Sequence, residues 1–258
     1  VSICDIDSEI GEHVTDELGA KYGRKNVLYC RCDVTDYPQY EGDHVDIPPA
    51  PLREAFEMTM EVFNRLDIVI NNAGVMNDRF WELPVRLKKN FNHTIMIFNE
   101  RDPYNLLIHL LKYLRLFLLQ LIYDSNYNPG KHIKFVVIHK FYFGIYLRGP
   151  SVYVYFNGVI RGTLLAYRFL SKDRGGQGGV IVNTASTAFI RPQVSTPIYT
   201  ATNYAIDQYH VNLTGVRSIV ICPGLTDTGR ALVEILGKGQ SGSVWVVENG
   251  TPAREWRG

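Results

Sequence analysis

The chain has 258 residues, of which 46% are hydrophobic and 21% charged, and its formal net charge is +1. A chain of this length and composition fits one large α/β domain that buries a sizeable core. The balanced charge gives no electrostatic reason to expect nucleic acid or a membrane surface as a partner, and we predict neither.

The four cysteines, Cys4, Cys30, Cys32 and Cys222, lie in apolar, strand-like runs and lack the spacing of a metal site. We therefore predict buried free thiols, no metal, and a reducing, cytoplasmic location. The N-terminus has no signal-peptide pattern. Because the chain starts at Val1 without methionine and already reads as a strand, we expect further residues in front of it.

The first third of the chain is expected to alternate between strands and helices. Ile10, Val14 and Leu18 are spaced four apart, as on one face of a helix, and Ser8 is a candidate N-cap. The expected elements are strands at 1–4, 26–32 and 67–70 and helices at 8–22 and 52–66. This alternation predicts βαβ units and a doubly wound parallel sheet.

The last hundred residues continue the same pattern. We expect helices at 159–170 and from Tyr199, a flexible turn at 175–179, and strands at 180–185, 216–222 and 244–247, the last strand ending the fold. The chain is therefore interpreted as one domain over 1–258, interrupted at about 86–155.

Two segments depart from the pattern. Residues 41–51 are proline-rich and are expected to form a surface insertion. Residues 86–155 are rich in Leu, Ile, Phe, Tyr, Asn and Lys; within them 106–123 is apolar but carries basic residues, and 133–147 is strand-like. Three interpretations stay open for this region: a transmembrane helix, a lid or interface helix, and a translated non-coding stretch.

The chemistry of the chain centres on Ser186 and Tyr199. Ser186 ends an apolar strand, and Tyr199 follows thirteen positions later. A tyrosine, with an ordinary pKa of about 10, needs a nearby cation to act as a base near neutrality. A lysine one helical turn further along would supply it on the same face, but that position holds Asn203.

Together with Asn71-Asn72-Ala73-Gly74 after an apolar strand, this spacing resembles the short-chain dehydrogenases/reductases over about 1–85 and 157–250. The resemblance implies a Rossmann-like fold in which Ser186 polarises the substrate oxygen and Tyr199 is the acid/base. With Asn203 at the lysine position, we expect the rate to fall by about 10²–10⁴-fold.

The family often has a catalytic asparagine just before the helix that begins near 158. In the expected register Tyr155 takes that position, and Asn157 comes two residues too late.

The resemblance also implies a set of cofactor-binding residues. Asp5 would accept bonds from the adenosine ribose and repel a 2′-phosphate, which favours NAD over NADP; a cap at the start of the following helix is the alternative role for Asp5. The other expected contacts are Asp33 and Val34 at the adenine, Asn71, Ala73 and Gly74 beside the cofactor, Tyr199, and Pro223, Gly224, Thr226 and Thr228 toward the nicotinamide. Ala73 and Gly74 are small enough for the backbone to approach the ligand closely.

The family's Gly-x-x-x-Gly-x-Gly turn, which binds the pyrophosphate after the first strand, does not occur in this sequence. We therefore expect a Rossmann-like sheet that lacks its central first strand and binds NAD poorly.

Within the family, runs such as Cys-Pro-Gly-Leu-Thr-Asp-Thr-Gly are most similar to insect members of the 15-hydroxyprostaglandin dehydrogenase-like and alcohol dehydrogenase-like groups. This implies NAD-dependent oxidation of a secondary alcohol, such as a hydroxy-lipid of the prostaglandin type, to a ketone. The substrate would be a small-molecule alcohol or ketone, and a homodimer is the assembly implied. The alternative is a catalytically inactive relative that acts at most as a binding or dimerisation scaffold.

Overall fold

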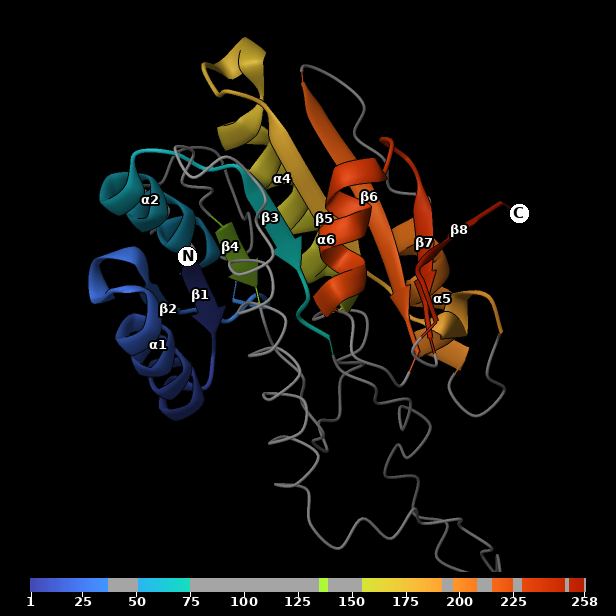
Figure 1. The fold of residues 1–258 in the computed structure, drawn as a ribbon, viewed down its shortest axis with the longest axis horizontal. Coiled ribbons are helices and arrows are strands. Elements are labelled where there is room, and N and C mark those ends of the chain that lie inside the picture. The colour runs from blue at the N-terminus through green and yellow to red at the C-terminus, as the bar shows by residue number, and fades with distance from the viewer. Residues whose placement is uncertain are drawn as a thin grey trace, which may run out of the picture.

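Among the residues described by the computed structural model, eight strands form a single sheet in the order β2-β1-β4-β3-β5-β6-β7-β8 (Figure 1). The described residues are 1–36, 51–74, 135–138, 155–191, 197–207, 215–224, 229–248 and 251–257. Most of the 41–51 insertion and of the 86–155 interruption lies outside them.

The strands are β1 Ser2–Asp5, β2 Leu28–Arg31, β3 Ile68–Asn71, β4 Phe135–Ile138, β5 Gly179–Thr184, β6 Val216–Pro223, β7 Val244–Val247 and β8 Arg254–Trp256. Neighbouring strands are parallel from β2 to β7, and β8 pairs with β7 in the antiparallel sense. The expectation that 244–247 is the last strand is wrong, because β8 adds a short edge strand after it. The parallel sheet with its connecting helices confirms the α/β, Rossmann-like class.

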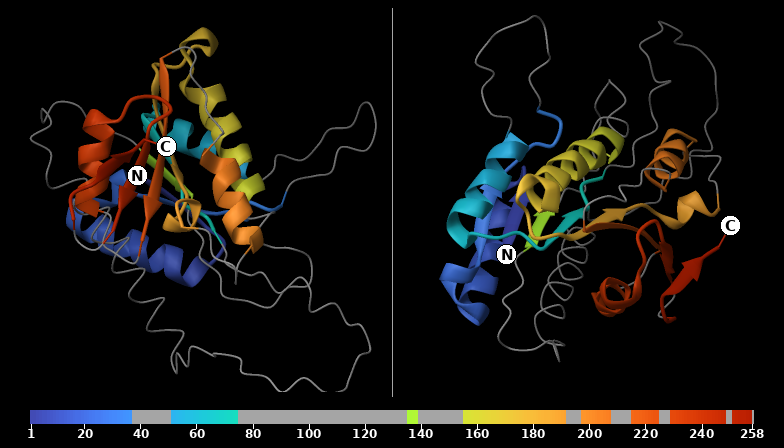
Figure 2. Two further views of the ribbon diagram at one scale, coloured as in Figure 1. Left: turned by 90° about the vertical axis from the view of Figure 1, so that its right-hand side faces the viewer. Right: turned by 90° about the horizontal axis from the view of Figure 1, so that it is seen from above.

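The helices are α1 Ser8–Tyr22, α2 Pro51–Phe63, α4 Gly158–Leu170, α5 Pro197–Asp207 and α6 Gly229–Lys238, with 3₁₀ turns η1 Arg24–Asn26, η4 Lys172–Arg174 and η5 Thr187–Phe189. Figure 2 shows α2, α4 and α5 on one face of the sheet and α1 and α6 on the other. The start of α1 corrects one expectation. Its N-cap is Asp7, whose carboxylate accepts from the Ile10 amide at 3.1 Å, and Ser8 is the first helical residue.

The core is divided by the sheet because successive side chains of a strand point to opposite faces. On β3, Ile68 and Ile70 pack with α1 and α6, whereas Val69 packs with α2 and α4. On β5 the same alternation places Val180 and Val182 on the α1 and α6 side and Ile181 on the α2 and α4 side. A third cluster joins α4 and α5 to β6 and β7. Apolar side chains on both faces of a strand are what a buried parallel sheet requires.

The centre of the sheet contains the main departure from expectation. β4 pairs in parallel with β1 on one side and with β3 on the other. It therefore fills the position that we expected to be missing between those strands. The strand-like stretch of the 86–155 interruption supplies it, so this part of the interruption belongs to the sheet (Figure 1).

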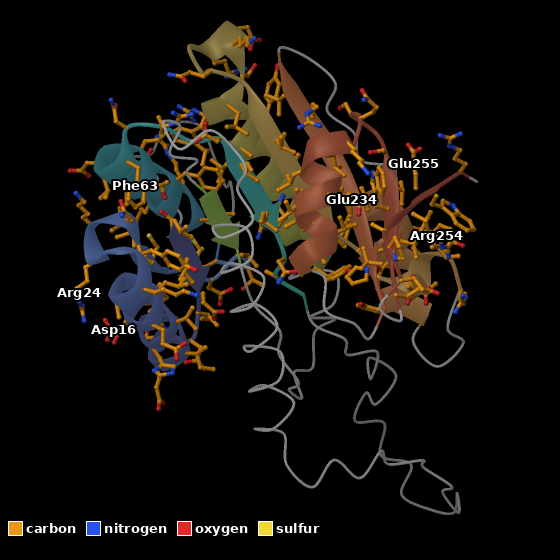
Figure 3. The ribbon with its side chains drawn as sticks, in the orientation of Figure 1. Asp16, Arg24, Phe63, Glu234, Arg254 and Glu255 are labelled. Carbon is orange, nitrogen blue, oxygen red and sulfur yellow. The ribbon has the colours of Figure 1, made fainter. Side chains whose placement is uncertain are left out.

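The charged side chains labelled in Figure 3 come from α1, η1, α6 and β8: Asp16, Arg24, Glu234, Arg254 and Glu255. Arg24 and Asp16 form an ion pair at 3.0 Å beside α1, with 80% and 61% of their side chains exposed. Glu234 on α6 pairs with Lys238 at 2.7 Å. Pairs this exposed contribute little to stability, so the buried clusters hold the fold together.

Candidate active site

The expected site residues follow the carboxyl ends of the parallel strands. Asp5 ends β1, Asn71 ends β3, and Pro223 ends β6. Asp33 comes shortly after β2, and Ser186 comes shortly after β5. Because parallel strands end at a common edge, the fold gathers these residues along one side of the sheet. In open α/β sheets this is the side at which ligands bind.

At the β1–β2 end of this edge, Asp5 is 5% exposed and its Oδ1 accepts from the Asp7 amide at 2.8 Å. Asp5 therefore shapes the turn into α1, while Asp7 caps the helix; the alternative role of Asp5 as the cap itself is wrong. The backbone oxygen of Asp5 accepts from the Cys32 amide at 2.9 Å, which holds the two strand ends together. Burial, followed by the charge of Asp33, raises the pKa of the Cys32 thiol to about 12.

The turn after β2 is fixed by its own side chains and by α4. Asp33 Oδ1 accepts from the amide and hydroxyl of Thr35 at 2.9 and 2.7 Å. Arg161 of α4 donates to the backbone oxygen of Val34 at 2.8 Å. Val34 is 3% exposed and its side chain lies against Gly158 at the start of α4. Sequence reasoning did not identify Arg161, because only the fold brings α4 over this turn.

The Asn-Asn-Ala-Gly run leaves the sheet through a buried polar cluster. Asn71 Nδ2 donates to Asn183 Oδ1 at 2.8 Å and to the Thr163 hydroxyl at 3.1 Å. The cluster joins β3, β5 and α4, and it fixes the direction in which Ala73 and Gly74 leave the strand. Among the described residues, Asn71 Oδ1 and Asn183 Nδ2 are buried without a hydrogen-bond partner, so the cluster is only partly satisfied.

Ser186 is the N-cap of the 3₁₀ turn η5, and its Oγ accepts from the Ala188 amide at 3.2 Å. Gly224, after β6, donates its amide to the Val247 oxygen at 2.8 Å. A Cβ on Gly224 would lie 3.6 Å from the Thr187 side chain, so the Pro223-Gly224 turn and the Ser186 turn are neighbours. Thr226 and Thr228 lie outside the described residues.

Tyr199 and Asn203 lie one turn apart on α5, as their spacing predicts. Tyr199 is 8% exposed and Asn203 is fully buried. The Asn203 amide is held at both ends: Nδ2 donates to the Tyr199 backbone oxygen at 2.7 Å, and Oδ1 accepts from the Tyr155 hydroxyl at 2.9 Å. The residue at the expected lysine position thus contacts the residue at the expected asparagine position.

The Tyr155 side chain fills the space between α5 and the turn after β3. Its ring centroid lies 5.2 Å from that of Tyr199. A Cβ on Gly74 would lie 2.5 Å from the Tyr155 ring. Burial, followed by the proximity of the Tyr199 hydroxyl, raises the pKa of Tyr155 well above its ordinary value, so this phenol is protonated at neutral pH.

The prediction that Cys4, Cys30, Cys32 and Cys222 are buried free thiols is confirmed. Within the described ranges, His, Cys, Asp and Glu side chains form no group of three that could hold a metal ion. In that same part of the chain, no helix has the length and apolar character needed to cross a bilayer. Residues 106–123, for which a transmembrane helix was one interpretation, lie outside it.

A doubly wound α/β sheet with a serine, a tyrosine and an acidic strand end along its carboxyl edge defines a Rossmann-type protein. No family model matches the chain. It is 25% identical over 236 residues to mouse 15-hydroxyprostaglandin dehydrogenase [NAD(+)], covering 88% of this chain and 58% of the mouse protein. The human protein of that name is 25% identical over 246 residues, covering 92% and 62%. The chain thus spans about three-fifths of these relatives.

A second group of relatives matches a shorter part of the chain. Alcohol dehydrogenase 2 of Ceratitis cosyra is 38% identical over 79 residues, covering 28% of this chain and 31% of the fly protein. Among solved structures, a 7α-hydroxysteroid dehydrogenase complexed with NADH and 7-oxo glycochenodeoxycholic acid has a TM-score of 0.56 at 16% identity, covering 98% of this chain and 84% of that one. A short-chain dehydrogenase from Mycobacterium avium has a TM-score of 0.54 at 17% identity, covering 96% and 68%. The curated relatives confirm the resemblance to short-chain dehydrogenases, and the solved structures show that the chain shares their fold.

Proposed function

We propose that the chain is an NAD-dependent oxidoreductase of the short-chain dehydrogenase type that oxidises a secondary alcohol to a ketone. One observation carries the proposal: the candidate residues gather at the carboxyl edge of the sheet. Asp5, Gly74 and Ser186 lie at or just after the ends of their strands, and Tyr199 lies on helix α5. The names of the mammalian relatives support NAD as the cofactor and a hydroxylated lipid of the prostaglandin type as the substrate.

The residues fit the adenosine half of NAD. Asp5 is an acidic strand end next to the turn that holds Asp33 and Val34, and this turn is fixed by hydrogen bonds. An acidic residue at this position accepts from ribose hydroxyls and disfavours a 2′-phosphate, which supports NAD over NADP.

The residues around the expected nicotinamide position fit that half of NAD less well. The space above Gly74, where the expected close approach of the ligand would occur, is taken by the Tyr155 ring. Asn203 supplies no charge to Tyr199, because it is a neutral amide engaged by Tyr155 and by the Tyr199 backbone.

The roles of the chain's own residues follow from their chemistry. Bound NAD would accept the hydride from the carbinol carbon. Ser186 would donate a hydrogen bond to the substrate oxygen, and Tyr199 would receive the proton of the alcohol. Because no cation assists Tyr199 from position 203, turnover should be lower than that of a lysine-containing site by about 10²–10⁴-fold.

A catalytically inactive relative is the second candidate, and the Tyr155–Asn203 hydrogen bond at 2.9 Å favours it. In that case the chain retains the fold and a nucleotide-binding edge, and acts at most as a binding or dimerisation scaffold.

The formation of NADH by the full chain, followed by absorbance with a panel of secondary alcohols, separates the two candidates. The variants are Asn203→Lys, the double variant Tyr155→Asn/Asn203→Lys, and Tyr199→Phe as the control. We expect slow turnover that rises most in the double variant and disappears in Tyr199→Phe. Absence of turnover in the wild type and in both lysine variants, all folded, would exclude the catalytic proposal.

A further inference from the structure

Tyr155 is held in the site by contacts with α5 and with the turn after β3. Residues 155–157 form a π-helical turn that leads into α4, and π turns are frequent at functional sites. The Tyr155 hydroxyl bonds Asn203 at 2.9 Å, its ring lies against Tyr199, and the side chain is 3% exposed.

The orientation of the Asn203 amide determines which atom accepts the proton of the Tyr155 hydroxyl. Because Asn203 Nδ2 donates to the Tyr199 backbone oxygen at 2.7 Å, its Oδ1 must face Tyr155. An amide oxygen only accepts, so Tyr155 donates. A phenol has one proton, and Tyr155 therefore has only lone pairs to offer the neighbouring Tyr199 hydroxyl.

The ring also takes the space that the glycine leaves. The atoms nearest to a Cβ on Gly74 are two ring carbons of Tyr155, at 2.5 and 2.6 Å. Cβ atoms do not come this close to other heavy atoms in folded proteins. In a cofactor-binding site, the missing side chain of such a glycine leaves room for the ligand. Here the Tyr155 ring takes that room.

We propose that the Tyr155 ring occupies the nicotinamide end of the cofactor site, so that in this state the site accepts adenosine nucleotides such as AMP and receives NAD only when the ring is displaced. This inference rests on the proposed function, because it uses the same site. At the adenosine end, the hydrogen bonds of Asp5, Asp33 and Arg161 join them to Asp7, Thr35 and Val34. That end therefore stays formed while the ring is in place.

The test is isothermal titration of the full chain with AMP, NAD and nicotinamide mononucleotide. In the wild type we expect NAD to bind no more tightly than AMP and the mononucleotide not to bind. In Tyr155→Ala we expect NAD to tighten by about tenfold relative to AMP, which corresponds to about 1.4 kcal/mol. Tyr155→Phe is the matched control: it keeps the ring, so the ratio of NAD to AMP affinity should match that of the wild type.

Each result supports or overturns the inference. An unchanged ratio of NAD to AMP affinity in folded Tyr155→Ala overturns it and leaves the proposed function standing. If Tyr155→Ala does not fold, the wild type decides: binding of the mononucleotide, or NAD binding about tenfold tighter than AMP, overturns the inference. If neither AMP nor NAD binds any folded variant, the proposed function fails as well.

Discussion

The Tyr155–Asn203 hydrogen bond should be measurable as a coupling free energy of unfolding. The variants are Tyr155→Phe, Asn203→Ala and the double variant. Both side chains are buried, with 3% and 0% of their surface exposed, and the bond is 2.9 Å long. A buried hydrogen bond is worth about 1 kcal/mol, and a buried partner left without one costs about 1–3 kcal/mol.

The two single variants should differ in cost. Asn203→Ala leaves the Tyr155 hydroxyl without its acceptor, so we expect a loss of about 2–4 kcal/mol. Loss of the Asn203 amide costs less at the Tyr199 backbone oxygen, because this oxygen still accepts from the Thr202 hydroxyl at 2.8 Å. Tyr155→Phe leaves an amide oxygen unpaired and should cost about 1–2 kcal/mol. Because both remove one bond, the double variant should cost about 1 kcal/mol less than the sum.

Urea denaturation followed by circular dichroism gives the four free energies of unfolding. Thr59→Val provides a comparison, because the Thr59 hydroxyl bonds Ser2 and the Ala55 backbone and shares no partner with Tyr155. Tyr155→Phe combined with Thr59→Val should be additive. Additivity of the Tyr155 and Asn203 variants to within about 0.5 kcal/mol would refute the assigned bond.

Three further predictions concern stability. Gly74→Ala should cost about 1–3 kcal/mol in urea denaturation, because its Cβ would meet the Tyr155 ring, and Tyr155→Ala should remove most of that cost; an equal cost in both backgrounds would contradict the contact. Asn71→Ala should lower the free energy of unfolding by about 2–4 kcal/mol, because it removes the hydrogen bonds to Asn183 and to the Thr163 hydroxyl. An unchanged urea midpoint would contradict these hydrogen bonds. Folding raises the pKa of the Cys32 thiol from 9.0 to about 12, so above pH 9 this thiol ionises in the unfolded chain but stays protonated in the folded one. The free energy of unfolding is therefore unaffected below pH 9 and falls as pH rises toward 12. Cys32→Ala should flatten that fall in melting temperature, and an unaltered slope would show that other groups cause it.

Local sequence patterns predicted the regular elements well where one face of an element is apolar. Ile10, Val14 and Leu18 place α1, and the apolar run at 244–247 coincides with β7. The patterns fail at weak or ambiguous signals. Strand β8 has three residues, Arg254 to Trp256, and its pairing with β7 decides its structure. Asp7 and Ser8 both have cap chemistry, and only the backbone geometry selects Asp7.

For the candidate site, the sequence likewise predicted local spacing but not long-range contacts. Motif spacing places Tyr199 and Asn203 one turn apart on a helix, and the structure has them so. The contact between Tyr155 and Asn203 spans 48 positions and depends on how α4 and α5 pack, which no local pattern encodes. For the same reason, the strand-like character of 133–147 could be recognised, but its place between β1 and β3 could not.

The central position of β4 has a consequence for the order in which the chain can fold during synthesis. Its partners, β1 and β3, end at Asp5 and Asn71, yet neither can complete its hydrogen bonding on that side until Ile138 has left the ribosome. Closing such long segments has an entropic cost before the pairing stabilises anything, and non-local pairings slow folding. Until then β1 can pair only with β2, and β3 has neither of its partners, because β5 also follows β4 in the chain. Unpaired strand edges therefore stay exposed on the nascent chain during this interval, which favours aggregation.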